Sequence, residues 1–145
     1  MRDTLLTWTA TRVLGYLRCS REEQLDSIEG QRKIVEVELA RRGVGFLLPP
    51  FTDDGRRGFD EERPGLLALM DYCRKHPLRP MTKADYIPIF TQSMDRFGRF
   101  LEPMKVFTYL NELRELGYDV YLLDERMSFV HGEIGEWIQI TVKSA

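Results

Sequence analysis

The chain has 145 residues, of which 43% are hydrophobic and 30% charged, a composition typical of one globular domain with its own core. No apolar run is long enough to span a bilayer, so we expect no membrane attachment. The formal net charge of −2 argues against a protein that binds nucleic acid over its whole surface, but leaves room for a local basic site. The two cysteines fit buried thiols of a cytoplasmic protein better than a disulfide framework.

The first half of the chain predicts an arm, a strand, a helix and a second strand. Residues 1–10 lack a clear period and are expected to form a loose arm. Residues 12–19 are mostly apolar, as in a short buried strand, and apolar residues then recur at helical spacing over 21–42. Residues 46–51 predict the second strand, which a Pro-Pro pair interrupts.

The second half predicts three helices and two strands. Pro64 suits the first position of a helix, and an apolar face follows it. We expect a strand over residues 85–90, a helix over 102–116 and another strand over 118–123. A last helix begins at about residue 132, and nothing follows its apolar face, so we expect a fragment of a longer protein, cut within this helix.

This alternation of strands and helices predicts an α/β fold, with a mostly parallel central sheet of about four to five strands and helices on both faces. We expect it to form one domain over residues 11–145. The carboxyl ends of parallel strands meet at one edge of the sheet, where such sheets bind ligands. Three polar clusters follow three successive strands and are expected to meet there: Arg18, Ser20 and Gln24; residues 53–63; and Asp95, Arg96 and Arg99.

Ser20 allows two interpretations. With Glu23 it forms the capping-box pattern, so taken alone it is more simply a helix cap. Its neighbours suggest more, because arginine forks bind two phosphate oxygens at once and stay charged. A serine beside several arginines suits attack on a phosphodiester, in which the guanidinium groups offset the developing charge. The simpler alternative is that the arginines form surface salt bridges with nearby carboxylates, which contribute little to stability.

Other chemistries have weaker support. His76 and His131 lie in predicted loops without ligand spacing, so no zinc site is expected. Four aspartates near strand ends could in principle bind Mg²⁺ for phosphoryl transfer: Asp53, Asp54, Asp95 and Asp124. The number of arginines makes a metal less necessary, and we expect neither a metal nor a small-molecule cofactor.

Taken in order, these motifs resemble those of the serine recombinases, the family of resolvases, invertases and large integrases and transposases. Tyr16-x-Arg18-x-Ser20-x-x-x-Gln24 resembles the nucleophile motif, and Ser27-Ile28-x-x-Gln31 continues it in the spacing of the large members. Three later segments resemble the next motifs of the family, in the same order: Asp53-x-Gly55-x-x-Gly58, Arg63-Pro64-Gly65-Leu66 and Asp95-Arg96-Phe97-Gly98-Arg99. The resemblance covers about residues 12–145, in the order of the family throughout.

The resemblance implies a site-specific DNA recombinase with the resolvase-like catalytic fold. Ser20 would attack a DNA phosphate, form a 5′-phosphoserine link and release a 3′-hydroxyl, without ATP or a metal. Four arginines would hold the phosphate: Arg18, Arg63, Arg96 and Arg99. Asp53, Asp95, Gln24 and Gln31 would support and orient them. The resemblance does not decide whether Asp53 or an arginine takes the proton from Ser20.

The resemblance also implies partners, namely DNA at the nucleoid and further copies of the protein in dimers and tetramers joined through the last helix. Two positions depart from the family pattern: Arg57 replaces the usual serine of the loop, and Ser93 stands where lysine is common. We expect Arg56 and Arg57 to add contacts to DNA. The rival hypotheses are a metal-dependent nuclease or phosphoryl-transfer domain, and a non-catalytic DNA-binding or assembly relative.

Overall fold

The structure is a computed structural model that describes residues 8–19, 27–55, 62–98 and 101–144. Its strands are β1 (Arg12–Cys19), β2 (Gly45–Phe46), β3 (Phe51–Asp54), β4 (Ile87–Thr91), β5 (Tyr118–Leu122) and β6 (Met127–Ser128). Its helices are α1 (Ile28–Arg41), α2 (Pro64–Lys75), the short 3-10 helix η2 (Lys83–Asp85), α3 (Met94–Gly98), α4 (Pro103–Glu115) and α5 (Ile134–Ser144).

The strands form one mostly parallel sheet, which confirms the predicted α/β fold. The strand order is β2-β1-β4-β5-β6, with β3 also paired to β1, and only β6 runs antiparallel to its neighbour. The second strand expected over residues 46–51 is divided into β2 and β3, which pair with successive parts of β1. The Pro-Pro pair lies between them, because proline has no N–H to donate to a sheet.

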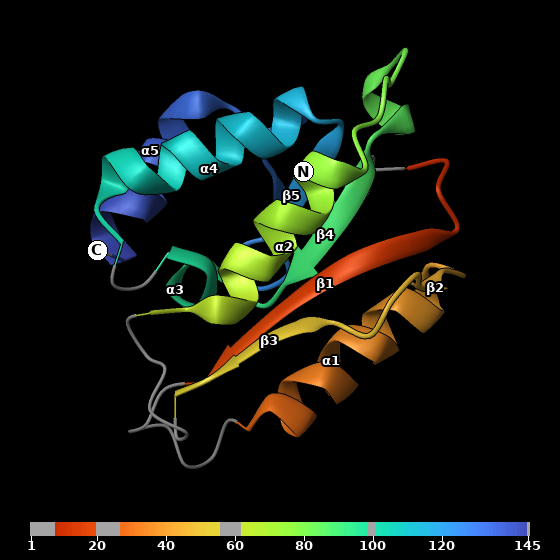
Figure 1. Cartoon of the computed structure of the whole chain (residues 1–145), viewed down its shortest axis with the longest axis horizontal. Coiled ribbons are helices and arrows are strands. Elements are labelled where there is room, and N and C mark those ends of the chain that lie inside the picture. Colours follow the sequence, from red (N-terminus) through yellow and green to blue (C-terminus); the bar gives the residue numbers. More distant parts are fainter. Residues whose placement is uncertain (1–7, 20–26, 56–61, 99–100, 145) are drawn as a thin grey trace.

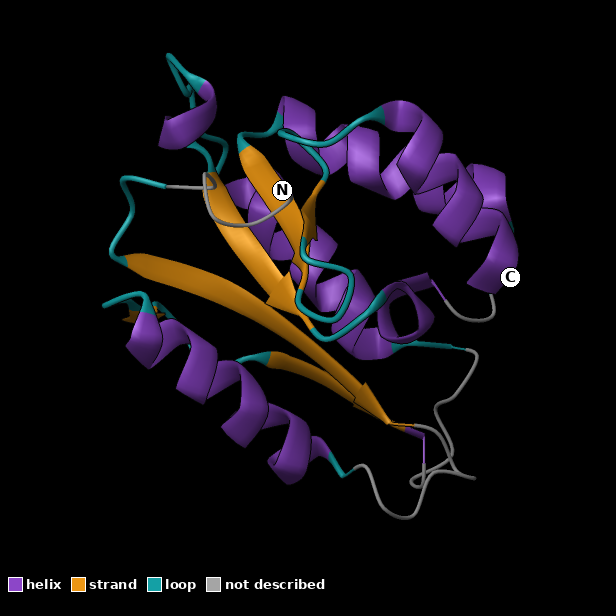
Figure 2. Ribbon diagram, turned by 180° about the vertical axis from the view of Figure 1, so that it is seen from behind, coloured by secondary structure: helices purple, strands orange, loops and turns teal. Residues whose placement is uncertain are grey.

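Helices cover both faces of the sheet, as expected (Figures 1 and 2). Successive side chains of a strand point to opposite faces, and β1 therefore contributes to two cores. Val13 and Leu17 pack with residues of α1 on one face. Leu14 and Tyr16 pack on the other face, in a larger core with α2, α3, α4 and α5.

Three elements differ from the sequence prediction. The helix expected over 21–42 begins at Ile28 in the described residues, and residues 21–26 lie outside the described part of the chain. The Ser27 hydroxyl caps this helix by accepting a hydrogen bond from Gly30 N at 3.0 Å. A separate short helix, α3, follows β4. The expected loop before the last helix contains β6, because Met127 and Ser128 pair with β5.

The end of the predicted arm is attached to the domain. Trp8 donates its indole N–H to the Asp119 carboxylate at 3.1 Å, and Thr9 N bonds to Ala84 O at 2.9 Å. These contacts differ from the loose arm expected over residues 1–10, of which 1–7 lie outside the described residues. None of the helices that the structure describes has both the length and the apolar character needed to cross a membrane.

Helix α5 is attached to the core through one aromatic side chain. Trp137 is fully buried, packs edge-on against Phe129 with ring centroids 5.1 Å apart, and donates its indole N–H to Ser128 O at 3.3 Å. Deleting such a side chain removes buried area and leaves a cavity.

Trp137→Ala is therefore expected to lower the free energy of unfolding by about 3–5 kcal/mol. Val37 on α1 is 70% exposed, so Val37→Ala is the control and should change stability by less than about 0.5 kcal/mol. Urea unfolding followed by circular dichroism measures both. Equal midpoints for the two variants would contradict this role of Trp137.

Candidate functional site

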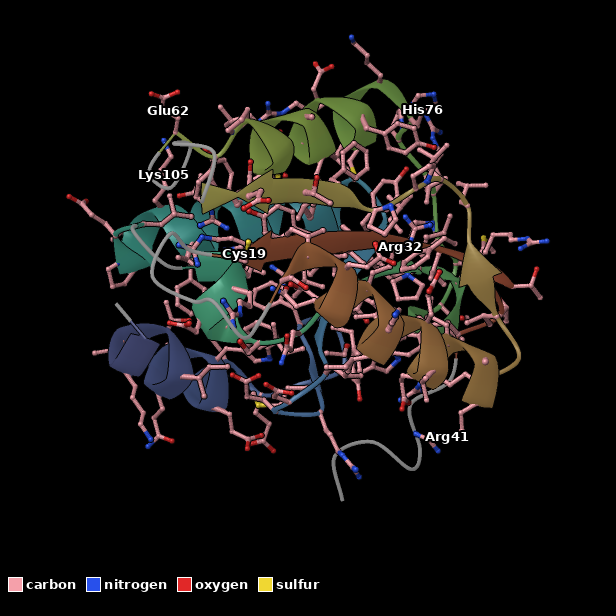
Figure 3. The ribbon with its side chains drawn as sticks, turned by 90° about the horizontal axis from the view of Figure 1, so that it is seen from below. Cys19, Arg32, Arg41, Glu62, His76 and Lys105 are labelled. Atoms are coloured by element: carbon pink, nitrogen blue, oxygen red, sulfur yellow. The ribbon has the colours of Figure 1, made fainter. Side chains whose placement is uncertain are left out.

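The carboxyl ends of β1 and β3 lie beside the starts of α2 and α3 (Figure 1). Arg18 near the end of β1 lies in register with Asp53 of β3. Figure 3 shows this end of β1, marked by Cys19, in the layer between α2 on one side and α1 on the other. The predicted meeting of the strand ends at one edge is therefore present in the fold.

Asp53 joins two strands and a helix at this edge. Its Oδ1 accepts a hydrogen bond from Gly65 N at 2.6 Å, and its Oδ2 accepts one from Leu66 N at 3.0 Å. The Tyr16 hydroxyl donates to Oδ2 at 2.6 Å. Asp53 thus binds the N–H groups at the start of α2, where a negative charge is favourable, and ties them to β1.

Gly65 allows this close contact. A Cβ atom at this position would overlap the main chain of Thr52, so a side chain would push α2 away from β3. Asp53 follows Thr52 directly, and its carboxylate would then no longer reach the helix N–H groups at their observed distances. The glycine of the Arg-Pro-Gly-Leu segment thus has a packing role.

Tyr16 connects Asp53 to Arg63. Arg63 donates to the Tyr16 hydroxyl oxygen through Nε at 3.2 Å and Nη2 at 2.9 Å, while the hydroxyl hydrogen goes to Asp53. Burial raises the pKa of Tyr16 above its ordinary range, the Asp53 carboxylate acts in the same direction, and Arg63 opposes them. Tyr16 therefore stays neutral at physiological pH and acts as a fixed bridge between the two charged groups.

Arg63 also reaches α3. Its Nη2 donates to Arg96 O at 2.9 Å, which links the start of α2 to the start of α3. Its own backbone has a left-handed conformation with φ of 51°, which is uncommon for residues other than glycine. The side chain is 2% exposed, so the surrounding contacts hold this conformation in place.

Gln31 of α1 holds the backbone of Arg18. Its side-chain amide accepts from Arg18 N at 3.2 Å and donates to Arg18 O at 2.5 Å, the two bonds that a neighbouring strand would supply. Both residues are fully buried. The end of β1, directly before Ser20, is therefore attached to α1 on this side.

Ser93, the second departure from the family pattern, caps α3. Arg96 N bonds to Ser93 O at 3.1 Å and to the Ser93 hydroxyl at 3.4 Å. A serine at this position fits the preference of helix starts for a short hydroxyl side chain.

Backbone pairing and hydrogen bonds connect five of the predicted residues at this edge: Arg18, Asp53, Arg63, Arg96 and Gln31. The residues Arg18, Arg63 and Arg96 are 0%, 2% and 7% exposed. Asp95 lies beside Arg96 in α3 and is partly exposed. Five further predicted residues lie outside the described part of the chain, namely Ser20, Gln24, Arg56, Arg57 and Arg99. No three His, Cys, Asp or Glu side chains come together as a metal site within the described ranges.

Sequence reasoning did not assign a role to Tyr16. Its position two residues before Arg18 places both side chains on the same face of β1, because side chains alternate along a strand. That spacing could have indicated a contact with Asp53, which follows at the same level on β3.

Comparisons with known proteins connect the chain to one family model and to solved structures. The chain matches the family model described as "Resolvase, N terminal domain" over residues 13–142. Its fold is similar to the crystal structure of the N-terminal catalytic domain of TP901-1 integrase, with a TM-score of 0.65 and 19% sequence identity. That alignment covers 91% of this chain and 92% of the other. No curated protein sequence matches the chain.

Removing the Tyr16 hydroxyl tests its bridging role. Tyr16→Phe leaves the ring in the core but deprives Asp53 and Arg63 of a buried partner, and we expect a loss of about 1–3 kcal/mol in the free energy of unfolding. Tyr86 is only partly buried, and Tyr86→Phe is the matched control, with a change of less than about 0.5 kcal/mol. Chemical denaturation compares the two. A Tyr16→Phe variant as stable as wild type would show that the bridge adds nothing.

Proposed function

The chain belongs to the resolvase family of serine recombinases, and from this premise we propose that it cleaves and rejoins DNA with Ser20 as the nucleophile. Residues 11–145 would form the catalytic domain, and the substrate would be a specific DNA site at the nucleoid. The proposal is carried by three buried arginines, namely Arg18 near the end of β1, Arg63 at the start of α2 and Arg96 in α3, together with the position of Ser20 directly after β1 in the sequence.

These arginines suit a phosphodiester substrate. Ser20 follows β1 directly and is two residues from Arg18. Guanidinium groups in a buried region act in a low effective dielectric, where their attraction for phosphate oxygens is stronger than in water. Arg99, three residues after Arg96, would add a fourth guanidinium, while Arg56 and Arg57 would contact the DNA backbone.

The reaction would exchange one phosphoester for another. The Ser20 hydroxyl oxygen forms a bond to the phosphorus, and the bond from phosphorus to the 3′ oxygen breaks. The serine proton goes to a base, and the leaving 3′ oxygen takes up a proton. Attack of a 3′-hydroxyl from another strand on the phosphoserine reverses these bonds and rejoins the DNA. Because the number of phosphoester bonds is unchanged, no ATP is needed, and the arginines would supply the positive charge that metal ions supply in other phosphoryl transfers.

Supporting residues would keep the arginines in place during this exchange. Asp53 and Tyr16 would hold Arg63. Gln31 would fix the backbone of Arg18, and Gln24 and Asp95 would complete the supporting set. Both oxygens of Asp53 already accept hydrogen bonds from Tyr16 and the start of α2, which favours an orienting role for Asp53 over proton abstraction from Ser20.

A second copy of the protein would cover the apolar groove between α4 and α5. Met104 is 78% exposed and Val142 is 61% exposed in this groove. The other lining residues are Pro103, Phe107, Asn111, Ile134 and Ile138. Exposed apolar patches of this kind mark interaction surfaces. Assembly through α5 would bring together the catalytic sites of two copies, which strand exchange requires.

The covalent intermediate gives the direct test of the chemistry. We expect the protein in its full natural length, incubated with its recombination-site DNA in excess chelator, to become covalently attached to DNA 5′ ends. Ser20→Ala should abolish this product, because it removes the proposed nucleophile, and Thr108→Ala, which changes an exposed hydroxyl of α4, should not. A denaturing gel separates the adduct from free DNA.

Two outcomes would contradict the proposal. Cleavage that requires Mg²⁺ and persists in Ser20→Ala indicates a metal-dependent nuclease. Binding and pairing of DNA sites without any covalent product indicates a non-catalytic relative.

The groove gives a separate prediction about assembly. Ile138→Asp places a charge among apolar side chains and is expected to weaken the dimer at least about tenfold, because burying an unpaired carboxylate is unfavourable. Val37→Asp, on the opposite face of the domain, should leave the dimer unchanged. Sedimentation velocity over a range of concentrations measures the difference, and equal association of the two variants would rule out this groove as the interface.

A further inference from the structure

Glu125 lies in the loop after β5, next to the turn from β4 into α3. Two backbone bonds hold this loop at the carboxyl edge of the sheet: Leu123 N bonds to Thr91 O at 2.9 Å, and Asp124 N bonds to Gln92 O at 2.7 Å. The loop therefore follows the path of the segment that leads into α3, although it is about thirty residues away in sequence.

The Glu125 carboxylate binds the first residue of α3. Its Oε2 accepts a hydrogen bond from Met94 N at 3.2 Å. Its Oε1 is buried and has no hydrogen-bond partner among the described residues. An anionic group is favourable at the N-terminus of a helix, where the first N–H groups have no partner within the helix.

Helix α3 carries two parts of the proposed site. Arg96 supplies a guanidinium group, and its carbonyl oxygen accepts the hydrogen bond from Arg63 Nη2 at 2.9 Å. A shift at the start of this five-residue helix would move both the Arg96 side chain and the acceptor of Arg63. Ser93 also binds this turn, but its hydroxyl contact to Arg96 N is long, at 3.4 Å.

We propose that Glu125 is a positioning residue of the catalytic site, which holds the first turn of α3 and thereby sets the places of Arg96 and Arg63. The inference rests on the proposed recombinase function. Glu125 acts through these two arginines and needs no contact with DNA. Neither its spacing nor its surroundings in the sequence indicated such a role, because the contact joins two loops that follow different strands.

The protonation of Glu125 gives this role a measurable signature. Burial raises the pKa of Glu125 above its ordinary value, the neighbouring Asp124 and Asp95 carboxylates add to the rise, and the bond from Met94 N opposes it. In the unfolded chain the same group ionises at lower pH, so the folded protein binds more protons between the two pKa values. Stability therefore falls as the pH rises through this window.

The strength of the hydrogen bond from Met94 N to Glu125 changes with pH in the opposite direction to the stability. A charged carboxylate accepts a hydrogen bond more strongly than a neutral carboxyl group, so the hold on Met94 tightens as Glu125 ionises. Across the window, the cleavage rate should thus rise while the stability falls. A residue with a purely structural role would move the two quantities together.

The experiment compares Glu125→Gln and Glu125→Ala with wild type, in the protein at its full natural length with its recombination-site DNA at saturating concentration. Glu115 at the end of α4 is exposed, and Glu115→Gln is the matched control. The measured quantities are the rate of covalent product formation and the DNA dissociation constant from pH 4.5 to 8, with the melting temperature over the same range.

We expect Glu125→Ala to lower the cleavage rate about tenfold or more at pH 8 with DNA affinity unchanged within about twofold, because a hydrogen bond to a charged group is lost. Glu125→Gln retains an acceptor oxygen without a charge, so its rate should lack the rise with pH that belongs to Glu125. Its melting temperature should exceed that of wild type at pH 7 and equal it near pH 4.5. Glu115→Gln should match wild type throughout.

Two results separate this inference from the proposed function. If wild type forms the covalent product and Glu125→Ala forms it at the same rate, or Glu125→Gln keeps the wild-type pH profile, Glu125 has no positioning role although the recombinase proposal stands. If wild type and Glu115→Gln both give no covalent product, the proposed function itself fails. Should Glu125→Ala not fold, the pH profile of Glu125→Gln decides alone.

Discussion

The Asp53 carboxylate is the contact on which the rest of the site depends. It binds two N–H groups at the start of α2 and the hydroxyl of Tyr16 on β1, and it does so at an edge where the two strands run in register. Through Tyr16 it fixes Arg63, and through Arg63 it connects to α3. One buried carboxylate of β3 thus contacts β1 and α2 directly and α3 through Arg63, and its contacts with α2 require the close approach of that helix to β3.

This arrangement makes the candidate site a part of the core. Arg18, Arg63 and Arg96 are as well buried as the apolar residues around them. Polar contacts within the domain hold two of them, since Gln31 binds the backbone of Arg18 and the Arg63 side chain donates to Tyr16. Fixed guanidinium groups need little reorganisation when a phosphate arrives, which is the condition under which electrostatic stabilisation of a transition state is strongest.

Periodicity and turn residues were enough to predict the α/β fold, the limits of β1 and α4 within a residue or two, and the meeting of the strand ends at one edge. Features set by tertiary contacts were not predicted. The pairing of both parts of the second strand with successive parts of β1 depends on the tertiary fold, and β6 is too short to leave a pattern. The bridging role of Tyr16 and the contact of Glu125 with α3 depend on neighbours from other strands, which spacing along one segment does not reveal.

The central claim is that the chemistry at this edge passes through Ser20, and mapping the covalent adduct tests it most directly. DNA trapped on the protein can be digested to a short nucleotide, and the modified peptide identified by mass spectrometry. The account predicts a 5′-phosphate-linked nucleotide on Ser20, in the peptide that follows β1. An adduct on any other residue, or a cleaved DNA site whose 5′ phosphate carries no peptide, would contradict it.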